Sequence, residues 1–176
     1  MNEAYNNIIT RRSIRNFTGE IVSKEIIDLI LEAGLAAPSA VNKQPWEILV
    51  VEDREILDTI ANLEGFYTKM TKKASAAIVV CGNTEKTLPG LAQIYWVQDT
   101  SAMTENILLA SHALGIGAVW TGVYPSVDRV KKVSELLDLP SHIIPLNIIP
   151  IGVISNENTF AKEIDKSCIH YGKWTK

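Results

Sequence analysis

The run of residues 76–81, A-A-I-V-V-C, constrains the fold more than any other segment, because all of its side chains are apolar. A strand with one face in water alternates apolar and polar side chains, and this run has no polar position. We therefore expect a strand that is buried on both faces. The chain has 176 residues, of which 47% are hydrophobic, so it can cover such a strand without disulfides or a metal.

Helical and extended patterns alternate along the chain. The predicted helices cover residues 2–10, 23–36, a stretch capped by Asp53, 92–114 and 126–137. The predicted strands cover residues 46–51, 76–81, 118–121 and 143–154. Because helices and strands alternate rather than fall into two blocks, we expect one α/β-type domain over residues 1–176. Residues 155–176 form a polar, irregular tail whose few apolar side chains are expected to pack on a second subunit.

Some predictions concern single residues of these elements. The helix at residues 2–10 is expected to turn Tyr5, Ile8 and Ile9 inward, and Ser23 is expected to cap the next helix. The helix at residues 92–114 contains no Gly or Pro over roughly 30 Å, which makes it the expected spine of the fold.

Charge and cysteine usage exclude several classes of protein. The net charge is −3 and the basic residues are spread along the chain, so no nucleic-acid partner is expected. Cys81 and Cys168 are far apart, which argues against a disulfide scaffold or a zinc site and favours a reducing, cytoplasmic setting. His112 and His142 have no second ligand at metal spacing, so no metal is expected. The chain shows neither a signal peptide nor an apolar run of the ~18 residues that a membrane span needs.

A basic cluster follows the first predicted helix. Arg11, Arg12 and Arg15 lie within five positions, with Ser13 between them. Guanidinium groups hold phosphate through fork-shaped, charge-assisted hydrogen bonds, so the cluster is a candidate phosphate site. On spacing alone, a solvated charged turn is the simpler interpretation.

The loop of residues 38–45 is the second candidate element. Ser39, Asn42 and Gln44 are hydrogen-bonding side chains between Pro38 and Pro45, suited to the edge of a planar heterocycle. Read by itself, the loop is an ordinary helix-to-strand connection.

Together, the motif R-R-S-x-R at residues 11–15 and the motif P-S-x-x-N-x-Q-P-W at residues 38–46 resemble the paired signature of the nitroreductase family. The segment L-G-I-G-A-V-W-T-G at residues 114–122 and the tail I-H-Y-G-K-W at residues 169–174 extend the resemblance over nearly the whole chain. It implies an α+β fold with three α/β/α layers, in which helices flank a mostly antiparallel sheet. It also implies a homodimer with a long central helix at the interface and FMN bound between the subunits.

The resemblance also implies roles for residues of this chain. Arg11 and Ser13, with Arg12 beside them, would contact the FMN phosphate, and Arg15 would approach the pyrimidine edge of the flavin. Pro38, Ser39, Asn42 and Gln44 would line the ring from the loop, in the site of either subunit. Thr121 and Gly122 would pass close to flavin N5, where glycine permits a close approach. In the tail, Lys162 is the expected phosphate contact, with Lys166 as the alternative.

The implied activity is a ping-pong transfer of two electrons from NADH or NADPH, through flavin N5, to a small flat acceptor such as a nitroaromatic or a quinone. No side-chain acid or nucleophile is needed, and Arg15 tunes the flavin electrostatically. Three alternatives remain open. They are a specialised flavin enzyme of the same fold such as a reductive dehalogenase, a non-catalytic module that stores FMN, and a scaffold in which the arginine cluster is only a surface turn.

Overall fold

Strand β2 (Ala76–Asn83) lies in the middle of the molecule, and all of its residues are buried. In the computed structural model, which describes residues 2–155 and 163–174, β2 pairs antiparallel with β1 (Trp46–Val51) on one side and β5 (Ile143–Val153) on the other. Its even-numbered residues, such as Ile78, lie in one apolar cluster and its odd-numbered residues, such as Val79, in another. The predicted burial on both faces is therefore confirmed.

The described residues form one antiparallel sheet with the order β1-β2-β5-β3, and β4 also pairs with β5. The prediction of a strand at residues 118–121 is partly wrong, because this stretch forms two short strands, β3 (Ile116–Ala118) and β4 (Thr121–Gly122). Val119 and Trp120 lie between them, outside the ladder. Gly117 lies in β3, where its missing side chain leaves room for residues packed over it.

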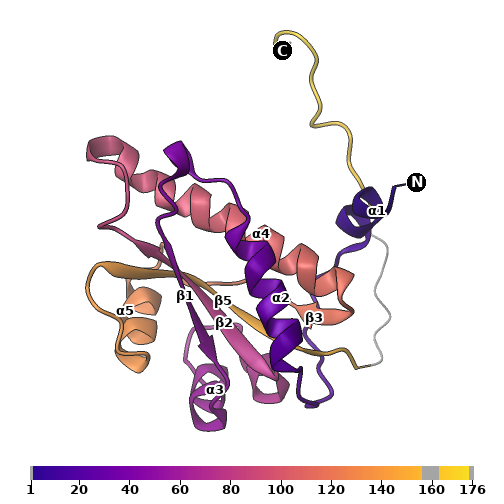
Figure 1. Ribbon diagram of the computed structural model, residues 1–176, viewed down its shortest axis with the longest axis vertical. Coiled ribbons are helices and arrows are strands. Elements are labelled where there is room, and N and C mark those ends of the chain that lie inside the picture. The colour runs from indigo at the N-terminus through magenta and orange to yellow at the C-terminus, as the bar shows by residue number, and fades with distance from the viewer. Residues whose placement is uncertain (1, 156–162, 175–176) are drawn as a thin grey trace.

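Helices cover both faces of the sheet (Figure 1). On one face, α2 (Lys24–Leu35) and α4 (Trp96–Ala113) pack Ile30 and Ile107 into the first apolar cluster. On the other face, α3 (Arg54–Ala61) and α5 (Val127–Leu136) pack Leu57 and Val133 into the second. The arrangement confirms the α+β fold with three α/β/α layers.

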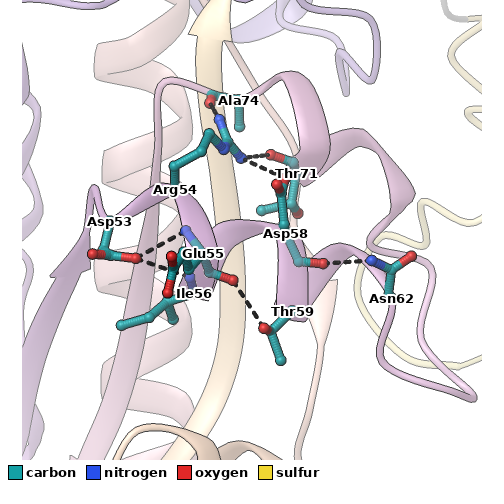
Figure 2. Close-up of polar contacts among 9 residues, drawn as sticks. All are labelled: Asp53, Arg54, Glu55, Ile56, Asp58, Thr59, Asn62, Thr71 and Ala74. Atoms are coloured by element: carbon teal, nitrogen blue, oxygen red, sulfur yellow. Dashed lines mark hydrogen bonds and ion pairs between the residues drawn. The ribbon is translucent and has the colours of Figure 1, made fainter.

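Apart from the helix predicted at residues 92–114, the predicted helix starts hold, but the two predicted caps differ. Figure 2 shows the Asp53 carboxylate, which accepts hydrogen bonds from the backbone N–H groups of Glu55 at 2.9 Å and Ile56 at 3.1 Å. Ser23 occupies the N-cap position of α2, yet its side chain makes no capping hydrogen bond. Asp53 therefore stabilises its helix in the way expected of a cap, and Ser23 does not.

Helix α1 (Glu3–Thr10) corrects one prediction, because its apolar residues do not face inward in the single chain. Tyr5 and Ile8 are more than half exposed, and no residue of α1 is buried. The helix is held instead by polar contacts to the C-terminal half of α4. The Asn7 side-chain amide donates to the carbonyl of Leu109 at 3.0 Å, and the Thr10 hydroxyl lies 2.9 Å from Nε2 of His112.

The long helix α4 is shorter than expected, since residues 90–95 form a 3-10 helix, η3 (Gly90–Tyr95), before it. Its remaining length is about 27 Å. In the described part of the chain, no helix is long and apolar enough to span a bilayer, and no group of metal-binding side chains occurs. Cys81 is buried, which raises the pKa of its thiol to about 12.

Candidate functional site

Residues 14–18 form an extended segment that places Arg15 beside the sheet. The Ile14 N–H donates to the carbonyl of Ala118 at 3.0 Å, and the Thr18 N–H donates to the carbonyl of Val153 at 3.0 Å. Ile14 and Phe17 are buried against the sheet, while Arg15 between them points outward and is exposed. Local pairing with strands β3 and β5 therefore fixes the position of Arg15.

Two glycines let this segment lie close to the sheet. A Cβ atom on Gly117 would be 2.8 Å from a side-chain carbon of Ile14, and one on Gly152 would be 2.9 Å from the Phe17 ring. Carbon atoms do not approach so closely without displacement. Glycine at both positions is a packing requirement of the Arg15 segment.

A cavity of about 280 Å³ opens beside Arg15. Its lining residues are Arg15, Tyr67, Val119, Trp120, Thr121, Gly122 and Arg129. The structure thus brings Arg15 together with Thr121 and Gly122, which come more than 100 residues later in the sequence. Among the described residues, the lining contains two guanidinium groups and no carboxylate, so it favours a group that carries or gains negative charge.

The backbone at Gly122 is open on its cavity side and anchored on the other. A Cβ atom on Gly122 would meet no atom within 4 Å, so a ligand can approach this backbone closely. The Arg129 guanidinium donates from Nη1 to the Gly122 carbonyl at 3.0 Å and lies 5.3 Å above the centre of the Phe66 ring. The Thr121 hydroxyl donates to the carbonyl of Ile148, which fixes the adjacent residue.

Arg11 and Arg12 line a different cavity of about 540 Å³. Arg11 Nε lies 3.3 Å from a carboxylate oxygen of Glu105, and Glu163 and Asp165 of the tail also line the cavity. Arg12 donates to the carbonyls of Ile9 at 2.9 Å and Arg11 at 2.7 Å. Both guanidinium groups therefore sit among acceptors of this chain, with which a phosphate would compete.

Ser13 is exposed and lines neither of these two cavities. Lys162 lies outside the described residues, and its predicted role is a proposal. Lys166 is exposed in the tail.

The loop at residues 38–45 has a strained, well-anchored backbone. Val41, Asn42 and Gln44 all have positive φ angles, 52°, 54° and 48°, which cost non-glycine residues energy. The Ala40 N–H donates to the carboxylate of Asp99 at 2.9 Å, and the Gln44 N–H donates to the Ser39 hydroxyl at 2.9 Å. Within the described residues, the side chains of Asn42 and Gln44 have no hydrogen-bond partner and are exposed, so they are free to bind another molecule.

The single chain does not bring this loop to the Arg15 cavity. Asp99, which anchors the loop, lies in the first turn of α4, whereas His112, which contacts α1, lies in the last turn. These residues are about 20 Å apart along the helix axis. Figure 1 shows the loop and α1 near opposite ends of α4, and none of the cavities described above is lined by the loop.

The sequence alone did not predict the roles of Asp99, Tyr67 and Arg129. Asp99 carries a recognisable signal, because an acidic residue in the first turn of a helix is favourable there and can accept N–H groups. Tyr67 and Arg129 come from a loop and from α5, and only the folded chain places them beside Arg15.

Comparisons with known proteins identify the family of the chain. A family model described as the nitroreductase family matches residues 8–77 and 62–153. A protein of Methanothermobacter thermautotrophicus, provisionally named NADH dehydrogenase/NAD(P)H nitroreductase, is 45% identical over 169 residues, which cover 95% of this chain and 85% of that protein.

Solved structures give the same result for the fold. A protein from Parabacteroides distasonis with the same provisional name matches with a TM-score of 0.91 at 42% identity, over 99% of this chain and 100% of that chain. A provisionally named nitroreductase of Desulfovibrio desulfuricans, solved in complex with FMN, matches with a TM-score of 0.81 at 29% identity, over 99% of both chains.

Proposed function

Since this chain belongs to the nitroreductase family, we propose that it is an FMN-dependent oxidoreductase. It takes two electrons from NADH or NADPH and passes them to a small flat acceptor such as a nitroaromatic or a quinone. The observation that carries the proposal is the cavity in which Arg15, Thr121 and Gly122 meet. The relative solved in complex with FMN supports the choice of cofactor.

The residues of the cavity fit a flavin ring. The open backbone at Gly122 admits a flat ring at close range, and Arg15 offers positive charge with no carboxylate among the described lining residues to cancel it. Arg11, Arg12 and Ser13 would hold the phosphate. To bind it, Arg11 would have to leave Glu105, whose carboxylate oxygen lies 3.3 Å from Arg11 Nε. Lys162 would add charge from the tail.

When bound, FMN supplies the carrier that accepts a hydride from the nicotinamide and returns two electrons to the acceptor. The protein contributes position and charge. Arg15 stabilises negative charge that develops on the bound ring, and the anchored backbone of Thr121 and Gly122 sets the distance of approach. The cavity of about 280 Å³ is at the small end for one ligand, so with the flavin ring bound in it the donor and the acceptor would use the exposed face of the ring in turn, as in a ping-pong mechanism.

We also propose that the active form is a homodimer. Pro38, Ser39, Asn42 and Gln44 do not line the Arg15 cavity of their own chain, and within the described residues the side chains of Asn42 and Gln44 have free donors and acceptors. In a second copy of this chain, the same loop would cover the cavity of the first. The tail at residues 155–176 would pack on the partner as well.

The test is an absorption spectrum after loading with FMN and removing the excess, followed by anaerobic addition of NADH or NADPH. We expect a retained yellow band that bleaches quickly. Arg11→Ala should reduce retention, because a phosphate contact is lost, whereas Arg15→Ala should lower the flavin potential more than the affinity. Retention without bleaching by either donor would favour a module that stores FMN, and absence of retention would refute the proposal.

A further inference from the structure

A second, strongly basic groove adjoins the proposed flavin cavity. It has a volume of about 600 Å³ and lies between residues 15–18 and the 3-10 helix η2 (Lys69–Lys73). Its charged lining residues are Arg15, Lys69, Lys72 and Lys73, and no carboxylate of the residues that the structure describes lines it. In a chain with a net charge of −3, this concentration of positive charge is a local feature.

The three lysines of η2 differ from other lysines of the chain, because they have no ion-pair or hydrogen-bond partner within the described residues. By contrast, Lys86 lies 2.6 Å from a carboxylate oxygen of Glu47, and Lys131 lies 3.8 Å from one of Glu135. The charge of the groove is therefore available to a ligand.

The backbone that carries these lysines is held firmly. Figure 2 shows Arg54 of α3 donating to the carbonyls of Thr71 at 2.9 Å and Ala74 at 3.0 Å. At the other end of η2, the buried Thr68 hydroxyl donates to the carbonyl of Ile60 at 2.7 Å. Both ends of η2 are held by hydrogen bonds to α3, so the backbone that carries the lysines is fixed. A ligand that binds there therefore loses less affinity to ordering of the protein.

We infer that this groove binds the 2′-phosphate of NADPH and makes the enzyme prefer NADPH over NADH. The inference rests on the proposed function, since it assigns a donor to the same site. Arg15 lines both the cavity and the groove, so a donor whose nicotinamide stacks on a flavin bound in the cavity can extend past the lysines of η2. NADPH differs from NADH by one phosphate monoester, and a monoester carrying nearly two negative charges at neutral pH is the group that unpaired lysines favour.

The test compares kcat/KM for the two donors in the FMN-loaded enzyme and in the variant Lys72→Gln/Lys73→Gln. One exposed charge contact changes affinity by up to about fivefold, so several together predict a preference for NADPH of about tenfold or more. The double variant should lose most of this preference. Its matched control, Lys86→Gln/Lys131→Gln, removes the same charge away from the groove and should keep the preference.

Binding is measured separately by calorimetry with adenosine 2′,5′-bisphosphate and with 5′-AMP. The bisphosphate should bind the FMN-loaded enzyme more tightly than 5′-AMP, and the double variant should remove the difference. Equal kcat/KM for both donors in the wild type would overturn the inference and leave the proposed function intact. Loss of FMN from the double variant would also overturn it, because the groove would then hold the cofactor phosphate. If neither donor bleaches the flavin, the proposed function fails, and the calorimetry still decides whether the groove recognises this phosphate.

Discussion

Arg129 connects the chemistry of the proposed site to the second helical layer. Its guanidinium donates to the Gly122 carbonyl at 3.0 Å and stacks over Phe66, so one side chain ties α5 and a loop to the end of β4. Within the described residues, the other N–H groups of the guanidinium have no protein acceptor. Arg129 therefore serves as a positioning residue for the Gly122 backbone and adds positive charge to the cavity.

Replacing Arg129 by methionine keeps an unbranched side chain over Phe66 but removes the donor to Gly122. We expect flavin bleaching by the nicotinamide donor to slow by about tenfold, because the backbone beside the ring is less fixed and the cavity loses a positive charge. The free energy of unfolding should fall by only about 1 kcal/mol, the value of one hydrogen bond. Stopped-flow absorbance measures the first quantity and urea unfolding the second.

Lys132→Met is the matched control, since Lys132 is on the same helix, pairs with Asp128 at 2.9 Å and does not line the cavity. It should bleach at the wild-type rate. If Arg129→Met bleaches as fast as this control, Arg129 has no positioning role.

At the scale of helices and strands, the sequence correctly predicted the features that depend only on residues close together in the chain. The apolar run in β2 and the cap at Asp53 carry their own signals, and both predictions are confirmed. The inward face of α1 was wrong because amphipathic spacing does not tell which molecule covers the apolar side. The interruption at Val119 and Trp120 depends on pairing with β5, which local spacing cannot show.

The residues of the candidate site also fall into those that the sequence predicted and those that it did not. Arg15, Thr121 and Gly122 were predicted from the family resemblance, and the fold brings them to one cavity. Arg129 and the lysines of η2 were missed, because their positions depend on the packing of α5 and α3. The cluster K-M-T-K-K at residues 69–73 was visible in the sequence, but its proximity to Arg15 was not.

Gly117→Ala tests whether the sheet surface positions the Arg15 segment. The added Cβ would lie 2.8 Å from Ile14, so residues 14–17 have to shift outward. We expect a loss of about 1–3 kcal/mol in the free energy of unfolding, as for other overpacked cores, together with weaker FMN binding. Urea unfolding and FMN titration by fluorescence measure the two effects.

Gly82→Ala is the control for general destabilisation, because its Cβ would lie 2.2 Å from the Trp96 ring, away from residues 14–17. It should destabilise the fold at least as much while FMN affinity stays closer to the wild-type value. Equal losses of FMN affinity in both variants would mean that stability, and not the Arg15 segment, controls binding.

At the scale of the whole molecule, the single chain leaves much apolar surface uncovered. Tyr5 and Ile8 of α1, Leu91 and Ile94 of η3, and Trp174 of the tail are all more than half exposed. Exposed apolar groups of this number indicate an interaction surface. The free side chains of Asn42 and Gln44 add unmatched polar groups, so a second copy of the chain would complete both the apolar surface and the site.

The homodimer predicts a particle of twice the 19.4 kDa of one chain in sedimentation at micromolar concentration. Tyr5→Asp places a charge on the exposed side of α1 and should weaken the dimer by at least about tenfold, because a buried, unpaired carboxylate is costly. FMN retention should fall with it, since the loop of the other copy leaves the cavity.

Val127→Asp, at an 83% exposed position on α5, introduces the same charge on the opposite helical layer and should change neither mass nor retention. A wild-type chain that sediments as a monomer while retaining FMN would show that one subunit forms the complete site, and the loop at residues 38–45 would then need another role.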